Sequence, residues 1–244
     1  MSGRVTLATA KRVLQQLRGD RRTLALVFVV PPGLLALLRY VFDAAPQTFG
    51  RVGAPLVGLF PLILMFLVTS IAMLRERTSG TLERLMSMPL AKLDLLLGYG
   101  LAFALVAAAQ ASVTGAVAFG LLGVTAEGAV WAVVALAVAN AVLGMALGLF
   151  LSAFATSEFQ AVQFMPAVIM PQVLLCGLFV PRERLPRALE LVSDVLPVSY
   201  AYEALRRVTR GEYGSPLWVD VAVVAGSTAL ALVLGATTLR RRTP

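Results

Sequence analysis

The chain has 244 residues, of which 59% are hydrophobic and only 14% are charged, and its mean hydropathy is +0.84. Because a soluble domain cannot bury that much apolar surface, the composition predicts an all-α, polytopic membrane protein. A single cysteine, Cys176, and the absence of histidine exclude a disulfide framework, a Cys/His zinc site and a His-dependent catalytic triad.

Residues 1–22 are polar and basic, and they predict a helix that lies on the membrane surface. Its apolar stripe would consist of Val5, Ala8, Val13, Leu14 and Leu17. A long apolar run follows, and we expect it to form a first span over residues 23–42. The basic stretch is long for a signal peptide and no small-residue cleavage site follows the run, so we expect this span to stay uncleaved.

Five more runs are long and apolar enough to cross a bilayer. They cover residues 52–74, 95–126, 129–155, 160–180 and 218–239. With six spans both termini lie on one side, and the segments on that side carry the whole net charge of +8. Since basic residues concentrate in cytoplasmic segments, both termini are predicted to be cytoplasmic. The basic charge of the chain therefore requires no nucleic-acid partner.

The segment 75–94 is a charged connection between the second and third of these spans. Ser79 and Gly80 can start a short helix, which Pro89 would end. The apolar face of this helix would be formed by Leu82, Leu85 and Met86. The helix could float at the lipid interface or be gripped by another protein. An ordinary loop that orients the chain by its basic charge is equally compatible with this stretch.

The longest connection, residues 181–216, carries two apolar-periodic stretches, each behind a proline. Pro186 and Pro197 stand where two short helices would begin. Glu203 and Arg206 are three residues apart in the second stretch, which predicts an ion pair on one helix face. We prefer this interpretation to a role in ligand binding.

No catalytic residue and no set of metal ligands is expected in this chain. A Walker A loop ends in Lys-Ser or Lys-Thr, and neither of the two lysines, Lys11 and Lys92, follows a glycine-rich loop. The interiors of the spans also lack the ionisable side chains that ion-coupled carriers usually place within the membrane. The chain is therefore not expected to be an enzyme, and the energy for any transport would come from another protein.

Two stretches resemble the ABC-2-type transporter permeases, the membrane subunits of ATP-driven exporters of drugs, polysaccharides and lipids. The first stretch is the run Glu76–Glu83, followed by Met88-Pro89-Leu90 and Leu95–Gly98. The second stretch contains Gly177–Pro181, Leu196-Pro197, Tyr200, Glu203 and Arg206. The resemblance covers about residues 70–210, and its specificity lies in the order in which these motifs occur.

This resemblance implies that the charged segment is a coupling helix, which docks into a separate ATP-binding cassette subunit. That subunit would bind ATP and Mg, and this chain would bind no cofactor. The docking residues would be Gly80, Thr81, Leu82, Glu83, Arg84, Leu85, Met86 and Met88. The connection 181–216 would form short re-entrant outer helices, with structural roles for Pro197, Tyr200, Glu203 and Arg206.

The family's unit contains two six-span halves, so the resemblance implies a homodimer, or a heterodimer with a similar permease, in the lipid of a bacterial plasma (inner) membrane. The substrate path would follow the dimer axis between spans two and five. Its candidate residues are Met65, Phe66, Ser70, Gln163, Phe164, Met170 and Gln172. Methionine and phenylalanine at helical spacing are also typical of core packing, so a packing role competes with this assignment.

The low number of charges in the bundle favours a hydrophobic or amphipathic substrate, such as a drug, a lipid or a lipid-linked glycan. Export follows from the resemblance alone. An alternative hypothesis is a non-transporting membrane scaffold or assembly factor with the same six spans, and a membrane-embedded enzyme is a third. The permease hypothesis predicts a partner ATPase whose turnover depends on this chain, whereas the scaffold hypothesis predicts none.

Overall fold

The computed structural model describes residues 3–80 and 92–238, and within them it consists of helices and connections without a strand. The helices are α1 (Gly3–Gly19), α2 (Arg21–Val41), α3 (Pro46–Thr78), α5 (Lys92–Gly120), α6 (Val130–Leu151), α7 (Glu158–Phe164), α8 (Met170–Leu175), α9 (Arg187–Val195), α10 (Pro197–Thr209) and α11 (Ser215–Thr238). A π-helical turn, Met165–Ile169, joins α7 to α8, and 3-10 turns occupy Ser152–Phe154 and Arg182–Arg184. The predicted all-α class is confirmed.

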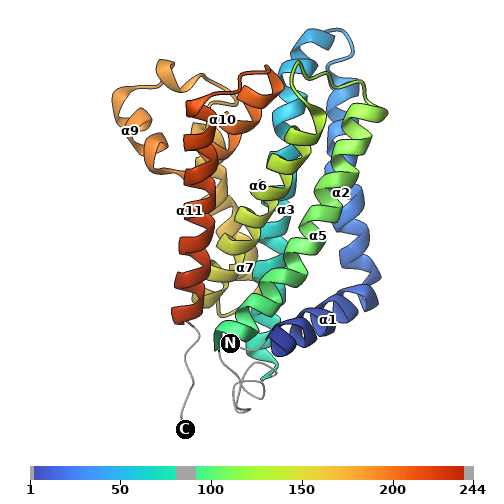
Figure 1. Cartoon of the computed structure of the whole chain (residues 1–244), viewed down its shortest axis with the longest axis vertical. Helices are drawn as coiled ribbons and strands as arrows, with labels where there is room; N and C mark the ends of the chain where they lie inside the picture. The colour runs from blue at the N-terminus through green and yellow to red at the C-terminus, as the bar shows by residue number, and fades with distance from the viewer. Residues whose placement is uncertain (1–2, 81–91, 239–244) are drawn as a thin grey trace.

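Five of the described helices, α2, α3, α5, α6 and α11, are long and apolar enough to cross a membrane. They run along the long axis of the molecule, whereas α1 lies across one end and α9 and α10 lie at the other end (Figure 1). The last turn of α11 lies at the same end as α1 (Figure 1). The polytopic membrane architecture is thus confirmed, whereas the predicted total of six membrane crossings stays a prediction.

The segment predicted as the fifth span, residues 160–180, is a succession of three short helical pieces, α7, the π turn and α8. Pro166 and Pro171 interrupt regular α-helix here, because proline has no amide proton and its ring crowds the preceding turn. Helical structure ends before Gly177, whose φ of +102° suits glycine alone. This run leads from the end of the bundle near α1 back toward α9 and α10 (Figure 1).

Two other helices differ in length from the spans expected from hydropathy. α3 begins at Pro46 and continues through charged residues to Thr78, so it extends beyond both ends of the predicted span 52–74. α5 ends at Gly120 instead of residue 126, because the chain turns at Gly123, whose φ is +68°. Hydropathy marks the part of a helix that suits hydrocarbon, whereas backbone hydrogen bonding continues into the polar region.

α3 lies at the centre of the bundle and packs most extensively against α6. Glycine on α6 allows this contact, since a Cβ at Gly144 would lie 2.1 Å from the carbonyl oxygen of Leu62. Gly148, one turn further, fits against α3 in the same way. The hydroxyl of Thr69 donates to the carbonyl oxygen of Met65 on its own helix at 2.7 Å and lies 3.2 Å from the carbonyl oxygen of Met145 across the interface. The small-xxx-small pattern on α6 therefore serves packing within the subunit.

α1 packs against the start of α5. Its buried face consists of Thr9, Ala10, Val13 and Leu17. Gly98 of α5 allows the approach, because a Cβ there would lie 2.5 Å from the Cβ of Thr9. Of the predicted apolar stripe, Val13 and Leu17 are buried, Val5 and Leu14 are half-buried, and Ala8 is exposed. The stripe is shifted because α5, and not lipid alone, covers one side of the helix.

Gly144→Ala should lower the free energy of unfolding by about 1–3 kcal/mol, because the added methyl group meets backbone that cannot rotate away. Gly226→Ala on α11 is the matched control, since no atom lies within 4 Å of the added Cβ. We expect the control to be neutral or about 0.5–1 kcal/mol more stable. Thermal unfolding of both variants in detergent measures the difference, and equal stabilities would contradict the close contact of α3 with α6.

Candidate functional site

The charged end of α3 leads directly into the segment 81–91, and a pair of charges ties it to α7. Arg75 donates two hydrogen bonds to Glu158, from Nε to Oε1 at 2.7 Å and from Nη2 to Oε2 at 3.1 Å. The hydrogen bond from Arg75 lowers the pKa of the Glu158 carboxyl, so this group is ionised at neutral pH. Residues 83 positions apart in the sequence are thereby joined.

A second polar contact connects α1, α3 and α5 at the same end. The Nη2 of Arg12 lies 3.5 Å from the carboxylate of Glu76 and donates a hydrogen bond to the hydroxyl of Tyr99. The guanidinium carbon of Arg12 also lies 5.6 Å from the centroid of the Tyr99 ring, within the range of a cation–π contact. This contact sits where the chain leaves α3 and, after the segment 81–91, enters α5.

The two helices that flank the segment 81–91 are thus held to their neighbours by polar contacts. Gly80 is the one predicted docking residue that the structure describes, and it follows the C-cap of α3, Ser79, with a φ of +70°. The other predicted docking residues, Thr81, Leu82, Glu83, Arg84, Leu85, Met86 and Met88, lie outside the described residues.

The residues of α3 that were predicted to line a substrate path lie inside the subunit. Met65, Phe66 and Ser70 are fully buried. Met65 packs in one hydrophobic cluster with Met145 of α6, and Phe66 packs in a second cluster with Leu143 of α6. These three side chains are therefore covered by the subunit itself. Met65 and Phe66 pack in the core, as the alternative interpretation of these residues expects.

The path residues predicted on the α7–α8 run have mixed exposure. Gln163 is exposed, Phe164 and Met170 are half-buried, and Gln172 is buried. The side-chain Nε2 of Gln172 donates to the carbonyl oxygen of Val168 at 3.0 Å, which satisfies a carbonyl beside the π turn. The structure therefore does not bring the seven predicted path residues together on one surface.

The side of α3 opposite Met65 and Phe66 is apolar and half-exposed, and sequence reasoning missed it. It consists of Phe60, Ile63, Leu64, Leu67, Val68 and Ile71. Beyond Gln160, the exposed residues of the neighbouring α7–α8 run are Val162, Gln163, Pro166, Ala167, Pro171 and Leu174. We call these two sets the α3/α7 face, since α3 contacts both α7 and the π turn. Their spacing of three and four residues is visible in the sequence, but the core-facing side of α3 has the same spacing.

At the other end of the bundle, α9 and α10 begin at the two prolines of the connection 181–216. Pro186 directly precedes α9, and Pro197 is the first residue of α10. Tyr200 ties the two helices together by donating its hydroxyl to the carbonyl oxygen of Asp194 at 2.6 Å. The carboxylate of Asp194 pairs with Arg182, whose guanidinium lies 5.4 Å from the centroid of the Tyr200 ring.

Glu203 is the centre of an ion cluster that joins α10 to α11. It accepts a hydrogen bond from Arg206 at 2.8 Å and lies 3.1 Å from Nη2 of Arg207. Arg207 in turn donates to Asp220 of α11 at 3.0 Å. Burial alone would raise the pKa of Glu203, but the hydrogen bond and charge of Arg206, with the charge of Arg207, hold it below its usual value.

The structure therefore contains the Glu203–Arg206 pair on one helix face, in a structural role. Sequence reasoning missed Arg207 and Asp220, because a contact between two different helices leaves no local spacing to recognise. A hollow of about 1270 Å³ opens beside the cluster. Its charged lining residues are Glu127, Arg182, Glu183, Glu203, Arg206, Arg210 and Glu212. Both signs of charge are present, so the lining does not single out an anion or a cation.

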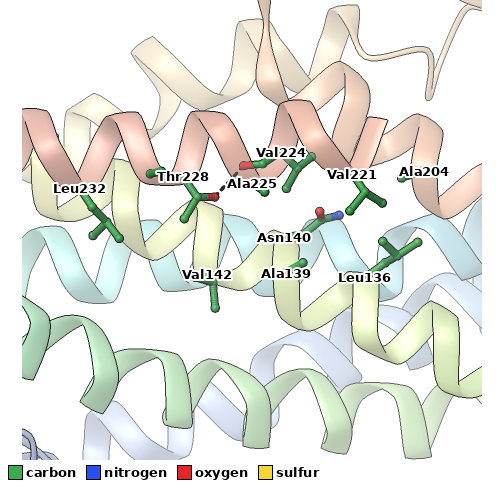
Figure 2. A pocket seen from close by; sticks show the side chains of 11 residues that line it. Leu136, Ala139, Asn140, Val142, Ala204, Val221, Val224, Ala225, Thr228 and Leu232 are labelled. Atoms are coloured by element: carbon green, nitrogen blue, oxygen red, sulfur yellow. Dashed lines mark hydrogen bonds between the residues drawn. The ribbon is translucent and has the colours of Figure 1, made fainter. Parts of the chain in front are cut away.

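An apolar crevice of about 370 Å³ lies between α6 and α11 (Figure 2). Asn140 and Thr228 are the polar residues that line it, and both bond to backbone. Asn140 donates to the carbonyl oxygen of Ala201 at 3.2 Å, and Thr228 donates to that of Val224 at 2.8 Å. The crevice thus suits hydrocarbon, and Asn140 anchors α10 to α6.

Arg207→Gln should destabilise the protein more than Arg187→Gln. The side chain of Arg207 is 26% exposed, and its loss would leave the carboxylate of Asp220, 8% exposed, without its partner. Arg187 is 75% exposed and pairs with Glu190 on the surface of α9. We expect a loss of about 2 kcal/mol for Arg207→Gln, below the roughly 3–5 kcal/mol of a fully buried pair, and under about 0.5 kcal/mol for Arg187→Gln. Thermal unfolding measures both, and similar losses would argue against the bridge between α10 and α11.

The sequence is similar to a family model described as "ABC-2 type transporter", which matches residues 4–209. ABC transporter G family member 20 of Dictyostelium discoideum is 28% identical over 160 residues, which cover 64% of this chain and 22% of that protein. Two Escherichia coli (strain K12) proteins, the probable multidrug ABC transporter permease YbhR and the inner membrane transport permease YhhJ, are 24% and 26% identical over 184 and 196 residues. Those alignments cover 72% and 78% of this chain and 50% and 52% of the relatives.

The chain therefore spans about half the length of these bacterial relatives and about a fifth of the Dictyostelium protein. The family model, in contrast, covers most of the chain, including the charged end of α3, the α7–α8 run and all of α10. The resemblance carried by Glu76–Glu83 and by Leu196–Arg206 is thereby confirmed. With its bundle of membrane-spanning helices, this protein belongs to the ABC-2 type transporter family.

Proposed function

We propose that this chain is the permease subunit of an ATP-binding cassette exporter, which moves a hydrophobic or amphipathic substrate out of the cell with ATP hydrolysed by a separate subunit. Membership of the family supports a role in transport. The observation that carries the coupling to ATP is the bracing of the helices around the segment 81–91, through Arg75–Glu158 and Arg12–Glu76. A segment that a partner pulls must be attached to helices that move with it.

The proposed partner grips the segment between Gly80 and Met88. ATP and Mg would bind to that partner, because the chain has no glycine-rich loop ending in Lys-Ser or Lys-Thr. Closure of two partner subunits would draw the ends of α3 and α5 together with α1 and α7. Since α3 packs along α6 over much of its length, the motion would be passed to the centre of the bundle.

The proposed assembly contains two copies of this chain, or one copy and a similar permease, that meet through the α3/α7 face. The face is formed by α3 and the α7–α8 run. It is apolar, and Gln163 is the one polar residue among those that define it. A substrate path on the two-fold axis would be lined by this face in place of Met65, Phe66 and Ser70, which the subunit itself covers. An apolar lining suits drugs, lipids or lipid-linked glycans, and YbhR is named as a probable multidrug permease.

The proposed location is a bacterial plasma membrane, with both termini cytoplasmic. The end of α11 lies at the same end of the bundle as the basic helix α1 (Figure 1). The end of α3, with Arg75 and Arg77, and the start of α5, with Lys92, also lie at that end (Figure 1). The cytoplasmic side of a membrane protein is enriched in arginine and lysine, which supports this orientation.

Replacing Glu83 and Arg84 by alanine should reduce co-purification of the partner ATPase by at least tenfold, because the change removes both charges from the proposed docking helix. The matched control is Glu183→Ala with Arg184→Ala, an adjacent pair of the same composition that is exposed at the opposite end. Affinity purification from the native membrane, with quantification of bound Walker-type ATPase, is the measurement. Unchanged association of the first variant would contradict the docking assignment.

Ala167→Cys, made in a Cys176→Ala background, should form a disulfide-linked dimer in native membranes. Ala167 is exposed on the π turn, and in a two-fold symmetric contact a residue near the axis faces its own copy. Ala222→Cys in the same background is the control, since Ala222 is exposed on α11, away from the α3/α7 face. Non-reducing electrophoresis after oxidation gives the result, and equal cross-linking at both positions would refute an interface through this face.

A further inference from the structure

Three cations form a straight line along the exposed side of α1. Arg4, Lys11 and Arg18 are each exposed, and successive members are seven residues apart. Seven residues make almost two turns of an α-helix, so the three side chains lie one above another on the same face. This face is turned away from the one that packs on α5. The side chain of Arg12, in contrast, contacts Glu76 and Tyr99.

The neighbouring residues extend this surface and do not neutralise it. Arg21 and Arg22, at the start of α2, are also exposed. Asp20 is the one acidic residue in the first 22 positions of the sequence, and its carboxylate accepts hydrogen bonds from the amide and hydroxyl of Thr23 at 3.1 and 2.6 Å. We call Arg4, Lys11, Arg18, Arg21 and Arg22 the basic stripe.

An apolar side chain stands on the same face as the cations. Leu7 is 63% exposed and lies between Arg4 and Lys11 in the sequence. A leucine among cations gains nothing from water, but at a membrane surface it can enter the boundary of the hydrocarbon while the cations remain at the headgroups. α1 lies across the end of the spanning helices, so a bilayer that surrounds those helices would have its surface near this end (Figure 1).

We propose that the basic stripe binds the headgroups of anionic phospholipids, such as phosphatidylglycerol, in the leaflet on the side of α1. The line from Arg4 to Arg18 is about 21 Å long, enough for several headgroups. Charge complementarity and the exposed Leu7 favour this partner over an acidic protein surface, which would leave Leu7 unused. The proposal does not depend on the function proposed above, since a scaffold of the same fold would present the same stripe.

Each cation near an anionic membrane surface strengthens association by about fivefold. The test uses the full chain in nanodiscs of phosphatidylcholine and phosphatidylglycerol, followed by native mass spectrometry of the lipids that stay bound. R4Q/K11Q/R18Q should reduce the enrichment of phosphatidylglycerol by tenfold or more. The control R184Q/R187Q/R210Q removes the same number of exposed charges at the opposite end and should change the enrichment by less than twofold.

The three replaced residues of the stripe are exposed, so R4Q/K11Q/R18Q should unfold at the temperature of the unchanged protein. The control also removes exposed side chains, with the surface pairs of Arg187 and Arg210, so its unfolding temperature should fall only slightly. Higher salt should reduce the enrichment of phosphatidylglycerol on the unchanged protein, because the contact is electrostatic. Equal enrichment in R4Q/K11Q/R18Q and the unchanged protein would overturn the proposal. An equal loss of enrichment in the two triple variants would also overturn it. If R4Q/K11Q/R18Q kept its lipid enrichment but lost a co-purified protein, the stripe would be assigned to that protein instead.

Discussion

The close approach of α3 and α6 is the constraint on which the rest of the structure depends. Within a membrane, side chains gain little by leaving lipid for a helix interface, so association relies on close packing and hydrogen bonds. Gly144 and Gly148 remove the side chains that would hold α6 away from α3, and the hydroxyl of Thr69 is shared between Met65 of α3 and Met145 of α6. The remaining helices are arranged around this pair, with α11 on α6 and α7 on α3.

Polar contacts at the two ends of the bundle fix the positions of the shorter helices relative to this apolar centre. Arg75 and Glu158 are each more than half exposed, so their pair contributes little to the free energy of unfolding. Its value lies in fixing α7 beside the end of α3. The cluster of Glu203, Arg207 and Asp220 is more buried. Removing one member would leave a largely buried charge unpaired and destabilise the folded protein. The two clusters lie at opposite ends of the bundle, and Arg75 and Glu158 are exposed there.

The α7–α8 run contrasts with α3, although both contribute to the half-exposed apolar face. α3 is a long, regular helix in spite of Pro55 and Pro61, whereas Pro166 and Pro171 leave a π turn between two helices of six or seven residues. A π turn exposes backbone carbonyls that need other partners, and Gln172 supplies one within the subunit. The α3/α7 face therefore combines a long regular helix with an interrupted one.

The sequence by itself determined the class of the protein, the places of its long apolar helices and its family. Apolar runs are long and contiguous, and Pro186 and Pro197 mark helix starts by their own chemistry, so these features need no tertiary information. Only the tertiary structure decided which side of each helix is buried. Met65 and Phe66 were predicted for the path and lie in the core, while Leu67 and Ile71 lie on the half-exposed face. In hydrocarbon both sides of a helix are apolar, so hydrophobic periodicity cannot distinguish a side that meets another helix from one that meets lipid or a partner. The same reason hid Arg207–Asp220 and Arg75–Glu158, whose partners are neighbours only after the helices have packed.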